Sequence, residues 1–185
     1  MHLVRYQVAV SIDGFIAPTD GSAEWLNPYG PVAGSFMQTW MKQIGGVIVG
    51  RTSYDQSGGM WGKTPALLMT SRPLPKMPKS VVTATGEAEG LAQLKARIPE
   101  GDIWLFGGGV TAGRFLRAGL IDLIEAAVVP VALGEGRPLF AGGPTQITFE
   151  HTGTQPLGLG CVLNSYRKIE ATRPQPAAGR RSRSR

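Results

Sequence analysis

Three consecutive glycines, Gly107, Gly108 and Gly109, form the motif of this chain that is best suited to bind a phosphate group. Glycine has no Cβ, so the backbone can approach a ligand closely and can adopt positive φ angles. The apolar run 103–106 before the glycines is typical of a buried strand, and residues 110–118 after them have the spacing of a helix. Because a helix that begins at such a turn presents free N–H groups and the positive end of its dipole, the segment predicts a nucleotide site.

The same segment fits the dinucleotide fingerprint of the Rossmann fold, with Ala112 in its last position. That fingerprint requires an acidic residue about 20 positions later, at the end of the following strand. Asp122 comes too early for this role, and Glu125 stands inside the predicted strand. The motif also lies late in the chain, whereas a Rossmann domain usually begins with it. We therefore disfavour a Rossmann domain.

Two carboxylates lie where their environment requires an explanation. Glu125 stands among apolar residues of the predicted strand 121–131, where an ionised carboxylate needs a partner. It can form a structural ion pair or a dimer contact, or it can serve the substrate site. Asp13 follows the first predicted strand in the sequence Ser-Ile-Asp-Gly, which favours an Asx-type turn with glycine at positive φ.

The positive charge of the chain is concentrated at its end. The 185 residues include 19 Lys and Arg against 13 Asp and Glu, a net charge of +6. Residues 171–185 hold five Arg and no acid, so the first 170 residues have a net charge of only +1. A Pro, Ala, Gly, Ser and Arg segment cannot bury apolar surface. We predict one domain over residues 1–170, a disordered basic tail over 171–185, and no specific nucleic-acid partner.

Cysteine and histidine are too scarce for several kinds of site. Cys161 is the single cysteine, which excludes an internal disulfide and a cysteine-based zinc site, and His2 and His151 are the only histidines. We predict no metal site. The longest apolar stretches are far below the ~18 residues of a membrane span, and the first residues run directly into a strand. The expectation is a cytoplasmic protein without a membrane partner.

The elements that must position these motifs alternate between strands and helices. Repeated strand–helix units followed by a run of strands predict an α/β fold, with a mostly parallel mixed sheet and an antiparallel C-terminal edge. Two glycines, Gly45 and Gly46, are expected to end the first helix. The predicted helices cover residues 35–44, a short stretch through 55, 87–97 and 110–118. The predicted strands cover residues 4–10, 47–49, 66–70, 80–83, 103–106, 121–131, 146–152 and 161–169.

Six motifs, in this order and spacing, resemble the dihydrofolate reductase-like superfamily. They are similar in particular to stand-alone relatives of the reductase domain of bacterial riboflavin biosynthesis, which follows a deaminase domain in the bifunctional protein. The resemblance covers about residues 3–169 and implies a three-layer fold with helices on both faces of the sheet. The motifs are SIDGFIA (11–17), VGRTSY (49–54), TSRP (70–73), LFGGG (105–109), AGLID (118–122) and PVALGEGRPLF (130–140).

The resemblance implies NADPH as the cofactor and assigns three motifs to it. Gly50, Arg51 and Thr52 would bring backbone N–H groups, a guanidinium and a hydroxyl to a phosphate. Ser71 and Arg72 would bind the 2′-phosphate of the adenosine ribose, for which a hydroxyl and an arginine are suitable. The residues that would lie against the pyrophosphate and the nicotinamide end are Gly107, Gly108, Gly109, Val110 and Thr111.

The resemblance also places residues beside the nicotinamide and the substrate. Ala9 and Ile16 would contact the nicotinamide end, and Asp13 is the candidate catalytic residue. Trp25, in the loop that follows, and Glu125 are candidates for the substrate site. Simpler interpretations stay open for the last three: a turn for the aspartate, packing for the tryptophan and an ion pair for the glutamate.

The reaction implied by the resemblance is the reduction of 5-amino-6-(5-phosphoribosylamino)uracil, with hydride delivered to the sugar C1′ of a small heterocyclic substrate. Dihydrofolate reductases place a carboxylate on the helix after this loop, whereas residues 25–54 contain no Asp or Glu. This departure disfavours dihydrofolate or another pterin as the substrate. A further alternative is an NADPH-binding module without turnover, because no strong general acid is visible. The sequence also leaves open whether the protein forms a homodimer.

Overall fold

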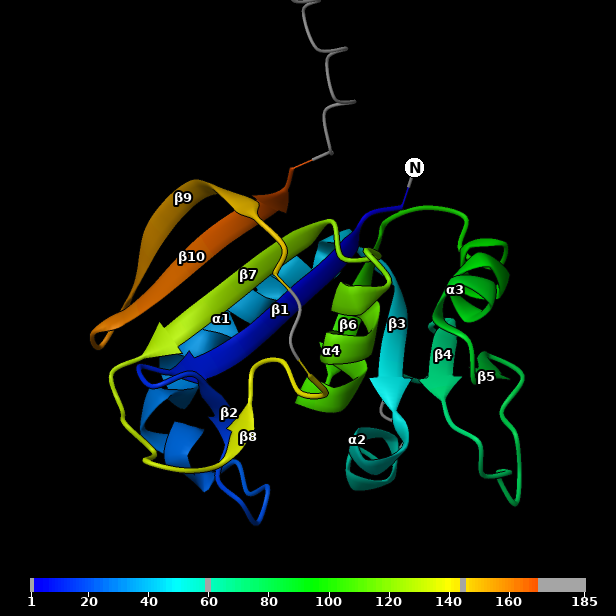
Figure 1. Ribbon diagram of the computed structural model, residues 1–185, viewed down its shortest axis with the longest axis horizontal. Helices are drawn as coiled ribbons and strands as arrows, with labels where there is room; N and C mark the ends of the chain where they lie inside the picture. The colour runs from blue at the N-terminus through cyan, green and yellow to red at the C-terminus, as the bar shows by residue number, and fades with distance from the viewer. Residues whose placement is uncertain (1, 59–60, 144–145, 170–185) are drawn as a thin grey trace, which may run out of the picture.

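An eight-stranded sheet is the framework of the structure, a computed structural model that describes residues 2–58, 61–143 and 146–169 (Figure 1). Its strand order is β5-β4-β3-β6-β1-β7-β10-β9. Neighbours from β5 to β7 are parallel, whereas β10 runs antiparallel to both β7 and β9. The strands are β1 (Val4–Ser11), β3 (Ile44–Gly50), β4 (Ala66–Met69), β5 (Val81–Ala84), β6 (Asp102–Gly107), β7 (Leu123–Val129), β9 (Phe149–Gly158) and β10 (Cys161–Lys168). The predicted mixed sheet with an antiparallel edge is confirmed.

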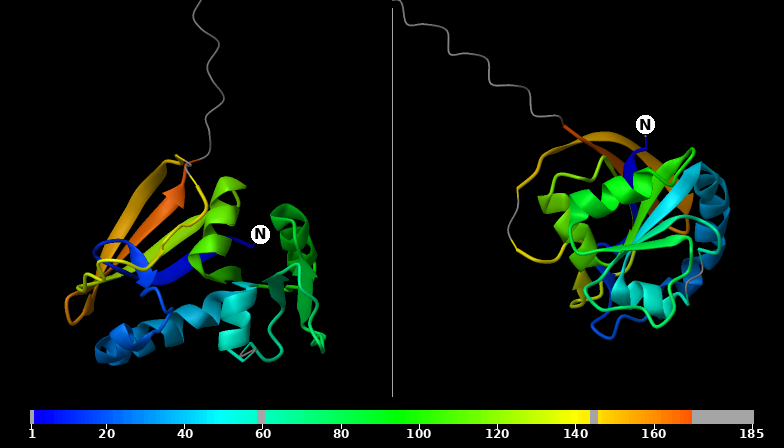
Figure 2. Two further views of the ribbon diagram at one scale, coloured as in Figure 1. Left: turned by 60° about the horizontal axis from the view of Figure 1, so that its bottom comes forward. Right: turned by 90° about the vertical axis from the view of Figure 1, so that its right-hand side faces the viewer.

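Helices cover both faces of this sheet, so the fold has three layers (Figure 2). The helices α1 (Gly30–Trp40) and α2 (Arg51–Gln56) lie on one face, and α3 (Glu87–Lys95) and α4 (Gly109–Arg117) lie on the other. Successive side chains of a strand point to opposite faces. Tyr6 of β1 is therefore fully buried with Phe115 of α4, whereas Gln7 faces α1.

The first helix begins and ends earlier than the sequence predicted. It begins at Gly30, with Pro31 in its first turn, and it ends at Trp40 before a 3₁₀ turn, Met41–Gln43. The prediction that Gly45 and Gly46 end this helix is wrong, because both lie in strand β3. A Cβ at Gly45 would be 1.9 Å from a backbone carbonyl oxygen, that of Glu100. The glycine is there for the close approach of two backbone segments.

The chain has two further short strands that the sequence did not predict. Strands β2 (Phe15–Ala17) and β8 (Arg137–Pro138) pair antiparallel in a small second sheet. A 3₁₀ turn, Glu24–Tyr29, lies between β2 and α1. This pairing joins the loop after β1 to the segment after β7 (Figure 1). It holds two distant sequence motifs together beyond the carboxyl ends of β1 and β7 (Figure 1).

Three further predictions concern the basic tail, membrane-spanning helices and metal sites. The predicted basic tail, 171–185, lies outside the described residues. In the described residues, no helix has the length and apolar character needed to cross a membrane. Across the same residues, no group of three or more His, Cys, Asp and Glu side chains could hold a metal ion.

Candidate functional site

A cavity of about 440 Å³ lies where β3 and β6 end and α2 and α4 begin. In open α/β sheets, ligands bind in the crevice at the carboxyl ends of the strands, so its position is that of a ligand site. The structure brings eight of the predicted cofactor residues together in its wall: Gly50, Arg51, Thr52, Gly107, Gly108, Gly109, Val110 and Thr111.

The glycines of this wall have two different roles. Gly107 has φ +107° and Gly108 has φ +52°, a region that side-chain-bearing residues rarely adopt. Gly108 is the N-cap of α4 and provides no side-chain cap, so the first N–H groups of the helix are left for another acceptor. At Gly109, in contrast, a Cβ would be 2.1 Å from the carbonyl oxygen of Pro138. Gly109 is thus required for packing against the chain and not only for contact with a ligand.

Arg51 connects the cavity to the loop that follows β4. Its Nε donates to both carboxylate oxygens of Asp55, at 2.9 and 2.8 Å. One of its terminal nitrogens lies 3.4 Å from the carbonyl oxygen of Arg72 and 3.3 Å from that of Pro73. Ser71 and Arg72 are exposed on this loop and do not line the cavity itself. The structure therefore places the predicted 2′-phosphate residues beside Arg51, at the outer side of the cavity.

Sequence reasoning missed two arginines in the cavity wall. Arg114 of α4 forms an ion pair with Glu87 and also donates to the carbonyl oxygen of Thr85. Arg137 of β8 donates to the carbonyl oxygen of Asp20 at 3.2 Å, and no carboxylate pairs with it among the described residues. Both had a signal in the sequence: Arg114 follows the glycine turn on the predicted helix, and Arg137 lies within the last quoted motif.

A second cavity, of about 430 Å³, adjoins the first, and Ser53, Gly108 and Arg137 line both. Ala9 and Ile16, predicted to lie near the nicotinamide, line this second cavity. Aromatic and amide side chains form much of its remaining wall. The members of this group are Gln7, Gln56, Trp104 and Phe106.

The aromatic wall of the second cavity is held by ring contacts and a hydrogen bond. The rings of Trp104 and Phe106 are 4.8 Å apart at 90°, and Trp61 packs edge-on against both. Nε1 of Trp104 donates to the carbonyl oxygen of Gln7 at 3.1 Å. Edge-to-face pairs of this kind hold aromatic rings in fixed orientations. The second cavity thus has a rigid wall that suits a flat, partly polar molecule.

Asp13 forms a tie between two loops and lines neither cavity. Its carboxylate accepts hydrogen bonds from the backbone N–H groups of Gly134, at 2.7 Å, and Leu133, at 3.2 Å, as well as from the Ser11 hydroxyl. The bond from Ser11, with those from the two backbone groups, lowers the pKa of Asp13. Gly14 follows at φ +89°, as the turn interpretation requires. The catalytic role of Asp13 stays a prediction.

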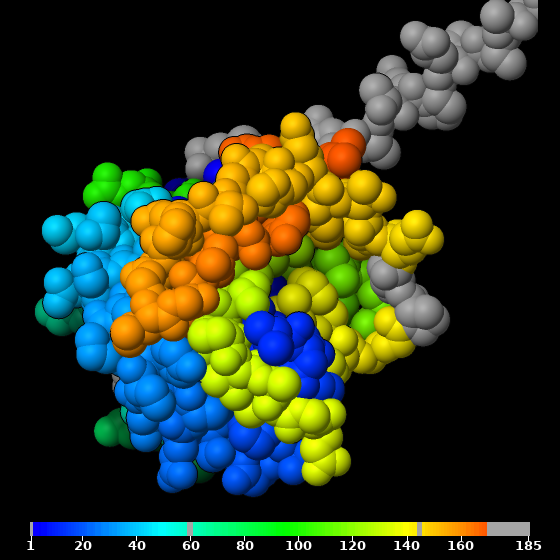
Figure 3. Space-filling view, turned by 90° about the vertical axis from the view of Figure 1, so that its left-hand side faces the viewer, coloured from blue at the N-terminus to red at the C-terminus, as the bar shows by residue number. Residues whose placement is uncertain are grey.

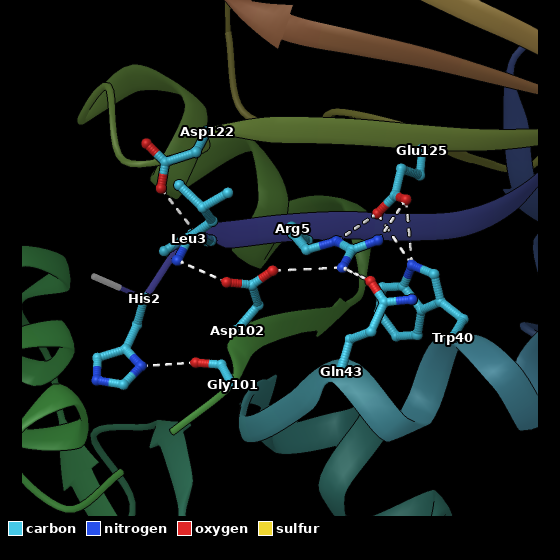
Figure 4. A network of polar contacts seen from close by, with 10 residues as sticks. His2, Leu3, Arg5, Trp40, Gln43, Gly101, Asp102, Asp122 and Glu125 are labelled. Atoms are coloured by element: carbon cyan, nitrogen blue, oxygen red, sulfur yellow. Dashed lines mark hydrogen bonds and ion pairs between the residues drawn. The ribbon is translucent and has the colours of Figure 1, made fainter. Parts of the chain in front are cut away.

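Glu125 is buried in an ion pair, as the structural interpretation proposed (Figure 4). The Arg5 guanidinium donates to its two oxygens at 2.8 and 2.6 Å, and Nε1 of Trp40 lies 3.1 Å from each. Arg5 also contacts Gln43 at 2.7 Å and Asp102 at 3.3 Å. This network joins β1, β6, β7, α1 and the following 3₁₀ turn, and Glu125 lines neither cavity.

Trp25 also lies away from the two cavities, in the 3₁₀ turn Glu24–Tyr29. It is half-buried, and its buried Nε1 has no hydrogen-bond partner among the described residues. Leu26, its neighbour, lines the second cavity instead. The substrate role predicted for Trp25 and Glu125 therefore remains without a contact to the cavity that would hold the substrate.

Comparisons with known proteins agree with this geometry. The family model of the RibD C-terminal domain matches residues 2–89 and 80–163. YwjB of Bacillus subtilis (strain 168) is 28% identical over 165 residues, which cover 86% of this chain and 95% of that protein.

Two solved structures illustrate the fold. A protein assigned to riboflavin biosynthesis in Shewanella sp. PV-4 is 21% identical, covers 91% of this chain and 99% of its own, and has a TM-score of 0.72. Dihydrofolate reductase from Enterococcus faecalis, in a complex with NADP(H), is 17% identical, covers 91% of this chain and 97% of its own, and has a TM-score of 0.64. The predicted dihydrofolate reductase-like fold is confirmed by these neighbours.

The family match spans most of the described chain, and it includes the strands and glycine turn that form both cavities. A pyrimidine reductase-like role and a place among the oxidoreductases follow from it at the level of the family. This chain belongs to the RibD C-terminal domain family, the reductase domain of riboflavin biosynthesis.

Proposed function

We propose that this protein is an NADPH-dependent reductase of a planar, pyrimidine-type heterocycle. The observation that carries the proposal is the junction of the two cavities at Ser53, Gly108 and Arg137. One cavity has the features of a phosphate site, and the other has an aromatic wall. A dinucleotide in the first cavity would present its reactive ring to a flat molecule in the second.

The residues of the first cavity fit NADPH. The start of α4 carries no side-chain cap, and such helix N-termini are ready sites for a phosphate. Arg51, Arg114 and Arg137 bring positive charge to the same wall. The exposed Arg72, beside Arg51, is available for a 2′-phosphate, because its side chain makes no hydrogen bond or ion pair within the described residues. The dihydrofolate reductase neighbour was solved with NADP(H), which supports the same cofactor here.

When bound, NADPH supplies the hydride. The residues of this chain contribute binding and orientation. Gly108 leaves space at the junction because it has no side chain, and hydride transfer requires a close approach of donor and acceptor. Trp104 and Phe106 exclude water from one side of the acceptor, and the Gln7 amide can orient its polar edge.

The proton that completes the reduction has no donor in the cavity wall. No Asp, Glu or His is found in the described lining of either cavity. The proposal therefore assigns the proton to water or to the substrate itself. It also keeps dihydrofolate as a disfavoured substrate, because protonation of a pterin is assisted by a carboxylate in the enzymes that this fold resembles.

The test follows NADPH absorbance with 5-amino-6-(5-phosphoribosylamino)uracil and with dihydrofolate in parallel. Binding of NADPH is measured separately by its fluorescence. Oxidation with the pyrimidine alone supports the proposal. Binding of NADPH without oxidation by either compound contradicts a reductase of these substrates and supports an NADPH-binding module, the alternative favoured by the missing acid. Failure to bind NADPH contradicts both.

A further inference from the structure

A third cavity, of about 430 Å³, continues from the inner side of the proposed substrate cavity. Gln7, Ala9 and Leu26 line both, so the two spaces adjoin. This inner chamber lies between α1 and the sheet. Its walls are mainly apolar and include Val32, Phe36 and Met37 of α1 and Ala127 and Val129 of β7.

Among the described residues, no charged side chain lines the inner chamber. Its polar members are neutral: Gln7, Asn27 and Tyr29, with the thiol of Cys161. The cation of the substrate cavity, Arg137, also lines the cofactor cavity and does not line the chamber. A phosphate placed in the chamber would lose its hydration without a cation to replace it, which is strongly unfavourable.

The buried arginine on this face of the sheet cannot serve such a phosphate. Arg5 is directed to Glu125, whose two oxygens it contacts at 2.8 and 2.6 Å, and to Gln43 and Asp102 (Figure 4). Arg5 is also 6% exposed and does not line the chamber. A charged group that withdrew Arg5 from this network would leave a buried carboxylate without its partner.

Gln7 marks the boundary between the polar and the apolar parts of this space. The residue is only 8% exposed, yet its side-chain amide makes no hydrogen bond within the described residues. Because Gln7 lines both cavities and its amide has no partner within the described residues, this side chain is available to a ligand that spans both. Beyond it, Val32, Phe36 and Leu157 line both the chamber and an outer groove of about 780 Å³.

The chamber therefore has an exit toward the surface. The outer groove lies between α1 and the end of β9, on the side of the molecule shown in Figure 3. There the β9–β10 hairpin, in orange, lies against the blue segment that contains α1. The part of the chain that the structure describes places no charged side chain in the lining of the groove either. An arm that outgrows the chamber can extend in this direction without meeting a charge.

We propose that the substrate of this protein carries an uncharged, mainly apolar arm, and that this arm binds in the inner chamber while the ring binds in the cavity beside the cofactor. The placement of the ring rests on the proposed function, but binding of the arm depends only on the chamber.

The test measures the binding of 5-amino-6-(alkylamino)uracils with ethyl, propyl and butyl groups by calorimetry, with and without NADPH. The phosphoribosyl compound is measured in the same way. Each added methylene should tighten binding roughly fourfold, because burial of one CH₂ contributes about 0.8 kcal/mol. The butyl compound should bind more tightly than the phosphoribosyl compound.

A chamber-filling variant locates the effect. Ala33 lines the chamber but is exposed, so Ala33→Phe fills space without replacing a core residue. It should remove the gain with chain length and leave binding of the ethyl compound within about twofold. Gln38→Phe is the matched control, since Gln38 is exposed on the same helix and lines none of the three cavities. Thermal unfolding checks that both variants fold. If Ala33→Phe does not fold, Ala33→Leu is used in its place.

Two results would overturn the inference: tighter binding of the phosphoribosyl compound than of the butyl compound, or the same dependence on chain length in Ala33→Phe as in the wild type. The outcome is separable from that of the reductase proposal. The alkylamino compounds have a saturated carbon at the position of C1′ and cannot accept a hydride there, so they report binding of the arm alone. Absence of NADPH oxidation in the separate absorbance assay contradicts the reductase alone. Alkylamino binding that does not depend on chain length contradicts the apolar arm alone.

Discussion

Individual residues in and around the proposed cofactor cavity divide into those that contact the chain and those left for a ligand. Arg51 is engaged by Asp55 and by two carbonyl oxygens of the loop after β4, whereas the side chain of Arg72 has no such contact within the described residues. Gly109 is required for packing, whereas a Cβ on Gly108 would meet only the Ser53 hydroxyl, at 3.6 Å. These differences decide which substitutions should affect cofactor binding alone.

Arg72→Ala should weaken NADPH binding by roughly 10- to 100-fold, because one charge-assisted contact contributes about 1.5–3 kcal/mol. NADH, which has no 2′-phosphate, should bind almost unchanged. Both affinities are measured by cofactor fluorescence. Lys76→Ala, on an exposed lysine a few residues further along the chain, is the control for loss of charge. An equal loss for both cofactors would show that Arg72 does not recognise the 2′-phosphate.

Gly108→Ala should fold but lose NADPH binding and turnover together. The backbone at φ +52° and ψ 157° is unfavourable for alanine, and the strain is of order 1–3 kcal/mol. The added methyl also enters the junction of the two cavities. Gly34→Ala is the matched control, because Gly34 is in α1 and has open space around it. Normal NADPH binding by Gly108→Ala would exclude the junction as the nicotinamide site.

Asp13→Asn should lower stability near neutral pH, with the difference from the wild type disappearing in acid. The folded protein lowers the pKa of Asp13 through its Ser11, Gly134 and Leu133 contacts. Such a carboxyl contributes stability above its unfolded pKa of about 3.9, and this contribution is lost as the pH falls through the folded pKa. Thermal unfolding from pH 3 to 7 measures the effect. Glu135→Gln is the control, because Glu135 is exposed on the loop whose backbone Asp13 contacts.

Turnover of the same Asp13→Asn variant separates the two interpretations of this residue. A fall in rate at unchanged NADPH affinity supports a role in orienting the substrate. Unchanged turnover supports the turn alone.

At the scale of elements, the sequence was sufficient for the unit around the triple glycine. The unit from β6 through α4 to β7 was predicted nearly as observed, because each part is encoded locally. Gly45 was misinterpreted because its reason is a contact with Glu100, which is distant in the sequence. The pairing of β2 with β8 was missed because the two strands are distant in the sequence. They are also only three and two residues long, which is too short to show a strand period.

The buried network around Arg5 and Glu125 is an element-scale feature with a measurable contribution. Removing one partner of a buried ion pair typically costs about 3–5 kcal/mol, because the other charge is left without compensation. Glu125→Ala should therefore lower the free energy of unfolding by that amount in urea titrations. The double variant Arg5→Met/Glu125→Leu should recover much of the loss. A loss below about 1 kcal/mol in Glu125→Ala would show that Asp102 and Gln43 are sufficient partners for the buried charge of Arg5.

For the whole molecule, the sequence predicted the layers (Figure 2) and eight residues that line the proposed cofactor cavity, but not the inner chamber. The lining of the chamber comes from β1, the 3₁₀ turn Glu24–Tyr29, α1, β7, β9 and β10, elements that only the folded sheet brings together. No motif of the sequence contains these positions in common. The chamber could therefore be recognised only in the folded structure.

Removal of residues 171–185 should leave the melting temperature and the NADPH affinity unchanged. The segment contains five Arg, no acid and no apolar periodicity, so its composition offers nothing to bury. Differential scanning calorimetry of the truncated and full-length chains checks the prediction. A decrease of several degrees in the truncated chain would show that the segment contributes to the fold.

The close packing of α4 has a consequence for the mobility of this helix in the free and the cofactor-bound protein. Gly109 and Gly113 leave no space for side chains between this helix and the carbonyl oxygens of Pro138 and Ala141, and the Ala141 N–H donates to the Gly109 oxygen at 2.9 Å. The helix is thus anchored by backbone before any ligand arrives. Little conformational entropy remains to be lost there on association, so the hydrogen-bonded amides of α4 from Ala112 onward should exchange slowly in the free protein and slow little further with NADPH. The uncapped N–H groups at the start of the helix should instead exchange fast and slow only when NADPH binds.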